Sequence, residues 1–111
     1  MPNKEDNEPH SEHYRVAAKD WVEKESAASM LEEAKSAVLA QRMAMLGDIP
    51  VSHAERSVKA SDEWGAYIRS MVDARKAANL AKVRMEYVKM RAMEEQSSNA
   101  NKRAEMRLVG G

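Results

Sequence analysis

Three groups of residues have the types needed for metal or acid–base chemistry, but none completes the pattern that such chemistry requires. His10 and His13 stand three residues apart among acidic residues, a spacing that lets two histidines share a metal ion, but their polar segment is expected to be frayed. Glu33 and Lys35 have the Glu-x-Lys spacing of some metal-dependent nucleases, where the two residues lie on a strand; here the pattern predicts the middle of a helix. His53 lies beside a predicted capping glutamate and is explained as a loop residue. We therefore expect no catalytic residue, no metal site, no cofactor and no enzyme activity.

Other classes of site are excluded by composition. The chain has no cysteine, which rules out disulfides, thiol catalysis and cysteine-based zinc sites. It has no glycine-rich phosphate loop and no His-Glu-x-x-His motif. No apolar run approaches the roughly 18 residues of a membrane span, and the opening MPNKEDNEPH lacks the regions of a signal peptide. We expect a cytoplasmic protein with no membrane contact and no small-molecule substrate.

The composition is typical of long helices. Of 111 residues, 32% are charged, with acids and bases equal at 18 each; nine are methionine and none is phenylalanine. Abundant Ala, Glu, Lys, Arg and Met with little Gly or Pro favours helices and coiled coils. Faces rich in alanine give thin, close helix contacts. We predict one all-α domain.

Start and stop signals divide the chain into two long helices. Gly47 and Pro50 end the first helix, and Ser52 with Glu55 forms a capping box that starts the next. A connection this short makes the two helices antiparallel neighbours. The predicted order is a disordered arm at 1–10, a helix at about 11–46 with Ser11 as its N-cap, a turn at 47–52, a helix from 53 or 61 to 96 or 108, and a disordered tail at 109–111. Ser61 is a second start signal, so 53–60 is either a separate short helix or the beginning of the second long one.

Apolar residues at heptad spacing predict how the two helices pack. On the second helix, Trp64, Met71 and Met85 lie on a seven-residue repeat, and a second repeat lies three residues later. Together they make an a/d seam of about four heptads that faces the first helix. The predicted intramolecular seam consists of Tyr14, Trp21, Leu31, Val38, Trp64, Tyr67, Met71, Met85 and Val88.

A second apolar row appears only in the later half of this helix. Leu80, Val83, Tyr87 and Met90 lie on roughly the side opposite to the seam. One neighbouring helix cannot cover both sides, and a helix that is apolar on two sides is usually buried between two neighbours. We therefore predict a self-associating hairpin, with a dimer as the first expectation and these four residues in the interface.

Basic residues line the flanks between the two apolar rows. Residues 64–111 carry a net charge of +5, from ten bases and five acids. Such lines could track phosphates of nucleic acid, or could pair with acids of the facing helix or of a second copy. Zero net charge of the whole chain favours pairing. The candidate nucleic-acid contacts are Arg75, Lys82, Lys89, Arg84 and Arg91.

The segment VDARKAANLAKVRMEYVKMRAMEEQ, followed later by NKRAEMRL, resembles small all-helical proteins that bacteriophages encode near their DNA replication and recombination genes. The similarity covers residues 64–108 and is carried by the short patterns DAR, AAN, AKVR and RAEMR. It implies a phage or prophage origin, a location in the host bacterial cell and an accessory role in DNA metabolism.

Two functions are therefore expected from the sequence. The first is a non-enzymatic phage accessory protein that works as a helical oligomer through protein–protein contacts, with a host or phage protein as a further partner. The second is a nucleic-acid-binding accessory protein that uses the basic lines of residues 69–91.

Overall fold

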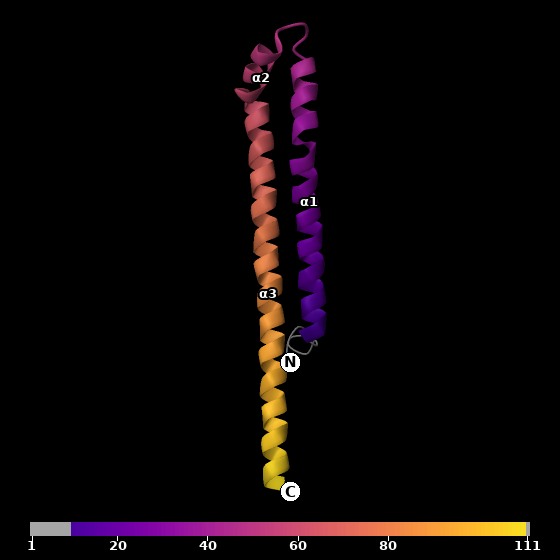
Figure 1. Cartoon of the computed structure of the whole chain (residues 1–111), viewed down its shortest axis with the longest axis vertical. Coiled ribbons are helices and arrows are strands. Elements are labelled where there is room, and N and C mark those ends of the chain that lie inside the picture. The colour runs from indigo at the N-terminus through magenta and orange to yellow at the C-terminus, as the bar shows by residue number, and fades with distance from the viewer. Residues whose placement is uncertain (1–9, 111) are drawn as a thin grey trace, which may run out of the picture. The chain divides into compact units, whose positions relative to one another are not determined.

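The computed structural model describes residues 10–110, and in this range the protein is all α-helical (Figure 1). Three helices follow one another: α1 (His10–Ala44), α2 (Val51–Lys59) and α3 (Asp62–Gly110). None of the described residues forms a strand. The all-α fold predicted from the composition is confirmed.

Contacts divide the chain into two compact units, and the two long helices pass through both. One unit is Val22–Asn79, and the described part of the other consists of residues 10–21 and 80–110. Within Val22–Asn79, the later part of α1 and the first part of α3 run antiparallel, joined by a turn and α2 (Figure 1). This unit is the helical hairpin that the sequence predicts.

The turn after α1 uses the predicted glycine. Gly47 has a φ of +87°, the left-handed conformation that glycine adopts without a Cβ penalty. Its amide donates to the carbonyl of Ala44 at 3.2 Å, and the amide of Leu46 donates to Met43 at 3.1 Å. Backbone carbonyls at the end of α1 are thus satisfied within the turn. The helix ends at Ala44, two residues before the expected position.

The start of α2 differs from the predicted capping box. The helix begins at Val51 with Pro50 as its N-cap, and no side chain caps it. Pro50 has φ −56° and ψ 140°, which suit the extended conformation of an N-cap residue, and its carbonyl accepts from the Ala54 amide at 2.9 Å. Because the proline ring fixes φ near the value that this position needs, the helix starts two residues earlier than expected. Ser52 consequently lies inside the first turn and is not the cap.

Ser61 separates α2 from α3, so the short helix is a distinct element. Its hydroxyl accepts from the amide of Trp64 at 3.2 Å, which is the bond of an N-cap residue. The same hydroxyl donates to the carbonyl of Val58 at 2.6 Å, near the end of α2. One side chain therefore ends one helix and begins the next. α3 continues through Gly65.

The ends of the long helices extend slightly further than predicted. α1 begins at His10, one residue before the expected cap at Ser11, and residues 1–9 of the predicted arm lie outside the described residues. α3 passes through SSNAN and reaches Gly110, so the first two residues of the predicted disordered tail are helical, and Gly111 lies outside the described residues. Serine and asparagine lower helix stability by only about half a kcal/mol each, far less than proline, and a helix already formed can extend through them.

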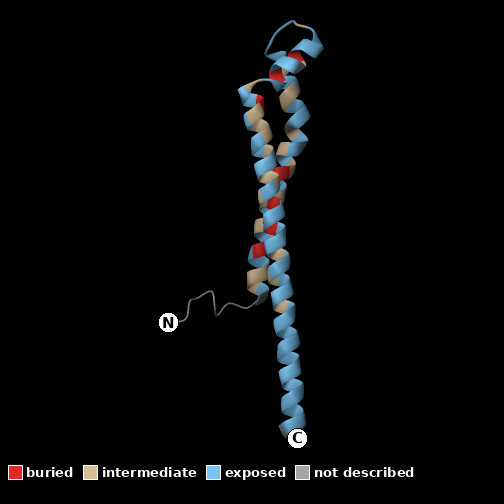
Figure 2. Ribbon diagram, turned by 90° about the vertical axis from the view of Figure 1, so that its left-hand side faces the viewer, coloured by how far each residue is buried: buried red, intermediate tan, exposed pale blue. Residues whose placement is uncertain are grey.

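The core is thin and built mainly from alanine (Figure 2). Ala28 and Ala78 have no exposed surface, and Trp64, with 6% exposed, is the large side chain among the buried residues. Small side chains at the contact let two helix backbones approach closely. No polar or charged residue is buried among those described. The buried residues are Ala17, Ala28, Ala54, Val58, Trp64, Ala78 and Ala81.

Candidate interaction surfaces of α3

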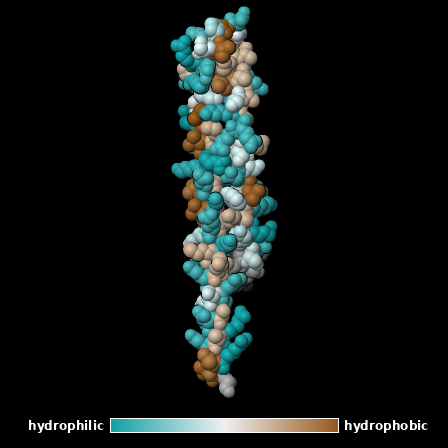
Figure 3. Space-filling model, in the orientation of Figure 1, coloured by the Kyte–Doolittle hydropathy of each residue, from teal (hydrophilic) through white to brown (hydrophobic). Residues whose placement is uncertain are grey.

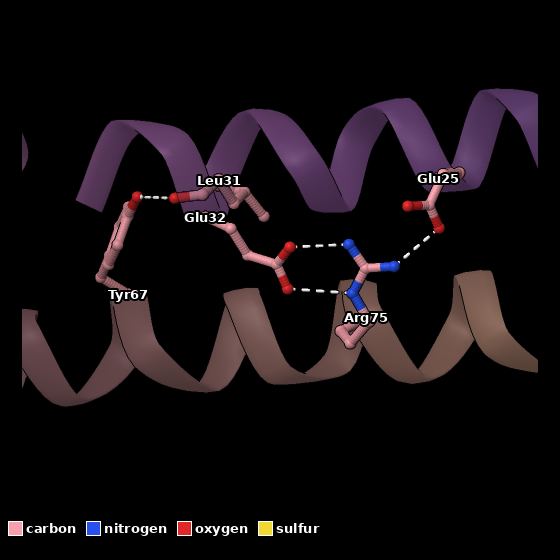
Figure 4. A network of polar contacts seen from close by, with 5 residues as sticks. All are labelled: Glu25, Leu31, Glu32, Tyr67 and Arg75. Atoms are coloured by element: carbon pink, nitrogen blue, oxygen red, sulfur yellow. Dashed lines mark hydrogen bonds and ion pairs between the residues drawn. The ribbon is translucent and has the colours of Figure 1, made fainter.

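The predicted seam residues are the less exposed residues of the two long helices. Trp64 is buried, and its ring stacks on that of Tyr67 with centroids 5.6 Å apart. The Tyr67 hydroxyl donates to the backbone carbonyl of Leu31 on the facing helix (Figure 4). The stacked aromatic pair on α3 is thus joined to α1 through the polar tip of Tyr67. The other predicted seam residues are half-buried: Tyr14, Trp21, Leu31 and Val38 on α1, and Tyr67, Met71, Met85 and Val88 on α3.

Arg75 joins the two helices of the hairpin through a fork of hydrogen bonds (Figure 4). Its Nε and Nη2 donate to the two carboxylate oxygens of Glu32, at 2.9 and 2.6 Å. Its Nη1 donates to Glu25 Oε2 at 2.6 Å. Glu25 and Glu32 are one heptad apart on α1, so both face the same point of α3. The guanidinium therefore links α1 and α3 at this register of the hairpin.

The Arg75 fork shifts the pKa of Glu32 and that of Arg75 itself. The hydrogen bond from Arg75 stabilises the ionised carboxylate and lowers the pKa of Glu32 below its ordinary value of 4.5. The same bonds, first that to Glu32 and then that to Glu25, raise the pKa of Arg75. Arg75 was one of the five candidate nucleic-acid contacts, and the structure instead places it between two acids of the facing helix.

The other four basic candidates lie outside the hairpin unit, on the later part of α3. Lys82, Arg84 and Lys89 are exposed, and no ion pair joins them to the residues that the structure describes. Arg91 contacts Glu94 at 3.6 Å, with 62% of its side-chain surface exposed. A surface pair of this length contributes little. These four side chains form two basic lines along one helix, and Arg75 does not belong with them.

The second apolar row of α3 is open to solvent. Leu80 is 61% exposed, Val83 62%, Tyr87 57% and Met90 50%. These four residues, here called the 80–90 stripe, follow one another at steps of three and four on one side of the helix. On the face drawn in Figure 3, apolar side chains lie in small separate patches. The stripe is the longest such row along a single helix side in the described chain.

Met93 extends the edge of the stripe and was missed by the sequence reading. It is 60% exposed, follows Met90 by three residues, and helps to line a shallow hollow with Met90, Glu86 and Ser97. The three-residue step from Met90 to Met93 is the sequence signal that could have identified it. Beyond it, every described residue from 93 to 109 is exposed, including Met106 and Leu108. The end of α3 is thus a single helix with no cover from the described residues of its unit.

The residues considered for metal chemistry do not converge. Among residues whose side chains are described, no group of three His, Asp or Glu is placed to hold a metal ion. His13 lies in the first turns of α1 and His53 in α2, while the side chain of His10 lies outside the described set. Glu33 and Lys35 are exposed in the middle of α1.

Neither the helices nor the comparisons with known proteins add a further assignment. No described helix combines the length and the apolar character that crossing a membrane demands. No protein-family profile, curated protein or solved structure matches the chain.

Proposed function

We propose that this protein is a non-enzymatic interaction protein that self-associates through α3 and acts by helix-mediated protein–protein contacts. The observation that carries the proposal is the exposed 80–90 stripe. Contiguous apolar surface that is exposed to water often marks an interaction site, whereas single scattered apolar side chains do not. Burial of such surface stabilises a complex by about 25 cal/mol per Å² of apolar area before the costs of association.

The seam and the stripe differ in a way that supports a separate partner for the stripe. The seam side of α3 carries the buried Ala78 and Ala81, and the stripe begins at Leu80 on the opposite side. Since a helix is about 10 Å across, α1 on one side cannot shield the other. A second helix is needed to cover the stripe, and a second copy of the chain supplies one of matching length.

The test is the molar mass in solution, measured by light scattering at tens of micromolar protein. We expect the wild type to be a dimer and Leu80→Glu to be a monomer, because the charge would be buried without a partner. The matched control is Met30→Glu, at a position on α1 that is 68% exposed and outside the stripe. It should remain a dimer. A monomeric wild type over the whole concentration range would remove the proposal.

A second candidate function is nucleic-acid binding by the later part of α3. Its support is the pair of exposed basic lines formed by Lys82 with Lys89 and Arg84 with Arg91. Phosphate contacts of this kind predict an affinity that falls steeply as salt rises. The double variant Arg84→Glu, Arg91→Glu should abolish a gel shift seen at low salt. If the wild type shifts neither single- nor double-stranded DNA at low salt, this function is excluded.

The proposal extends to a cellular role on the strength of the sequence resemblance of residues 64–108. That role is an accessory one in phage DNA metabolism, inside a bacterial host, with a host or phage protein as the further partner. Affinity capture from the bacterial host identifies such a partner. Capture by the wild type and not by Leu80→Glu would show that the partner needs the stripe or the dimer that it supports, whereas equal capture by both would place the contact elsewhere.

A further inference from the structure

We infer that the second copy lies antiparallel on the 80–90 stripe, with the two-fold axis passing close to residue 85. The inference rests on the proposed self-association and adds its geometry. Leu80, Val83, Tyr87 and Met90 occupy successive a, d, a and d positions of a heptad. In an antiparallel pair, each a position packs against a d position of the other helix. Leu80 then meets Met90 of the second copy, and Val83 meets Tyr87.

This arrangement closes on itself. The two contacts are repeated by the symmetry axis, so all four exposed side chains of each copy are covered in four layers. The two central layers combine the smaller Val83 with the larger Tyr87, and the two outer layers combine Leu80 with Met90, so space is filled evenly along the contact. A shift by one heptad in either direction would place two of the four apolar residues beyond the apolar row of the other copy.

Charges at the two ends of the stripe select the antiparallel direction. Lys76 occupies the d position before Leu80, and Glu94 occupies the a position after Met90. With antiparallel helices, Lys76 of one copy meets Glu94 of the other at both ends of the contact. With parallel helices in register, Lys76 would meet Lys76 and Glu94 would meet Glu94. Like charges at the a and d positions of the stripe interface are strongly unfavourable, because the interface excludes solvent there.

Residues at the edges of the stripe favour the opposite direction, but they act more weakly. A parallel pair would join Glu86 of one copy to Arg91 of the other, whereas the antiparallel pair brings Arg84 near its own counterpart and Glu86 near its own. These side chains lie at the margin, where they are long, exposed and screened by water and salt. The a and d positions of the stripe interface are closer together and less hydrated than these marginal positions. The charges at Lys76 and Glu94 therefore decide the direction.

Cysteine pairs distinguish the two directions, and the chain has no native cysteine to interfere. A disulfide needs Cα atoms within about 7 Å. In the antiparallel dimer, residue 80 is level with residue 90 of the second copy, while two residues 80 are about 15 Å apart along the axis. An equimolar mixture of Leu80→Cys and Met90→Cys chains, mixed under dissociating conditions and then oxidised, should give the mixed disulfide dimer. Leu80→Cys alone should give little covalent dimer.

The control is a mixture of Lys82→Cys with Met90→Cys, because Lys82 lies away from the stripe and should not cross-link. A covalent dimer formed efficiently by Leu80→Cys alone, with no preference for the mixed pair, would overturn the antiparallel geometry. Light scattering of the reduced variants is measured in parallel. Dimers that fail to give the mixed disulfide contradict the geometry alone, whereas monomeric wild type contradicts the proposed self-association itself.

A charge exchange gives an independent measurement that leaves the apolar layers intact. Lys76→Glu should weaken dimerisation at low salt, and Lys76→Glu with Glu94→Lys in the same chain should restore it. A parallel dimer predicts different results. Lys76→Glu alone would dimerise no more weakly than the wild type, because like charges face each other in both. The double variant would also place like charges together and would dimerise no more strongly than the wild type. Weakening by the single change without recovery in the double variant would count against the antiparallel pairing.

Discussion

The side chains of α3 have different surroundings in the hairpin Val22–Asn79 and in the later part of the helix. In the hairpin, Trp64 is buried, Tyr67 reaches the backbone of α1, and Arg75 is held between two acids. From residue 80 onward, the stripe residues are at least half exposed, and among the described residues the basic lines form one ion pair, that of Arg91 with Glu94 on the same helix. The difference indicates that the first part of α3 stabilises the hairpin, and it supports our proposal that the second part binds a second copy.

The largest expected effect is on the hairpin, from Trp64→Ala. Removing the buried ring leaves a cavity and ends its stacking on Tyr67, so the free energy of unfolding should fall by about 3–5 kcal/mol. Urea denaturation followed by circular dichroism measures it. The matched change in the other region is Tyr87→Ala, at an exposed aromatic. At a protein concentration where the chain is monomeric, this variant should lose less than about 0.5 kcal/mol. Equal losses would erase the distinction between the two regions.

A smaller effect is expected from Tyr67→Phe. The change removes the hydrogen bond to the Leu31 carbonyl and leaves the stacked ring, so the free energy of unfolding should fall by about 1 kcal/mol. The same denaturation experiment detects the difference. Tyr87→Phe serves as the control, because its 57%-exposed side chain lies in the stripe, and it should leave the stability of the monomer unchanged.

The Arg75 fork predicts a pH dependence of stability. Because the pKa of Glu32 is lower in the folded protein than its ordinary 4.5, the fork stabilises fully above that value, and this stabilisation is lost as the pH falls through the folded-state pKa. Arg75→Gln should lower stability at neutral pH and flatten this acid-side decline. Thermal melting of both proteins from pH 7 to acid values tests the prediction. Parallel stability curves at all pH values would show that the fork contributes nothing.

The smallest expected effect concerns the exposed end of α3. Deleting residues 97–111 removes helix that no described residue of its unit covers, so the urea midpoint of the hairpin should stay the same within error. A large drop in the midpoint would mean that this end has a partner within the chain.

Much of the fold was predictable because local signals agreed with one another. Gly47 and Ser61 mark helix boundaries through their backbone and hydroxyl chemistry, and both act as their sequence context indicates. The capping box at Ser52 was wrong because Pro50, two residues earlier, also fits the N-cap position, and a pattern of residue types does not rank two competing caps. The sequence does not determine where α3 ends, because polar residues such as Asn99 neither require nor forbid a helix.

The side-chain partners were less predictable than the helices. The seam follows from periodicity, but the heptad count does not say which acid each base will contact. By residue type and spacing, Arg75 fits either a basic line or a pair with the acids of α1. The net charge favours pairing, but the register of the hairpin decides that Glu25 and Glu32 are the acids within reach. For the 80–90 stripe, periodicity identifies an apolar side that α1 does not cover. It does not identify the molecule that binds there, because that molecule is not part of the single chain.

Hydrogen exchange at two protein concentrations tests the distinction between the two parts of α3 most directly. If the stripe is a self-association surface, amides of residues 80–92 should exchange more slowly at high than at low concentration, because the dimer stabilises this stretch. Amides of residues 66–79 should change less, since the hairpin already protects them in the monomer. Exchange at residues 80–92 that is independent of concentration, up to the highest concentration reached, would contradict the account.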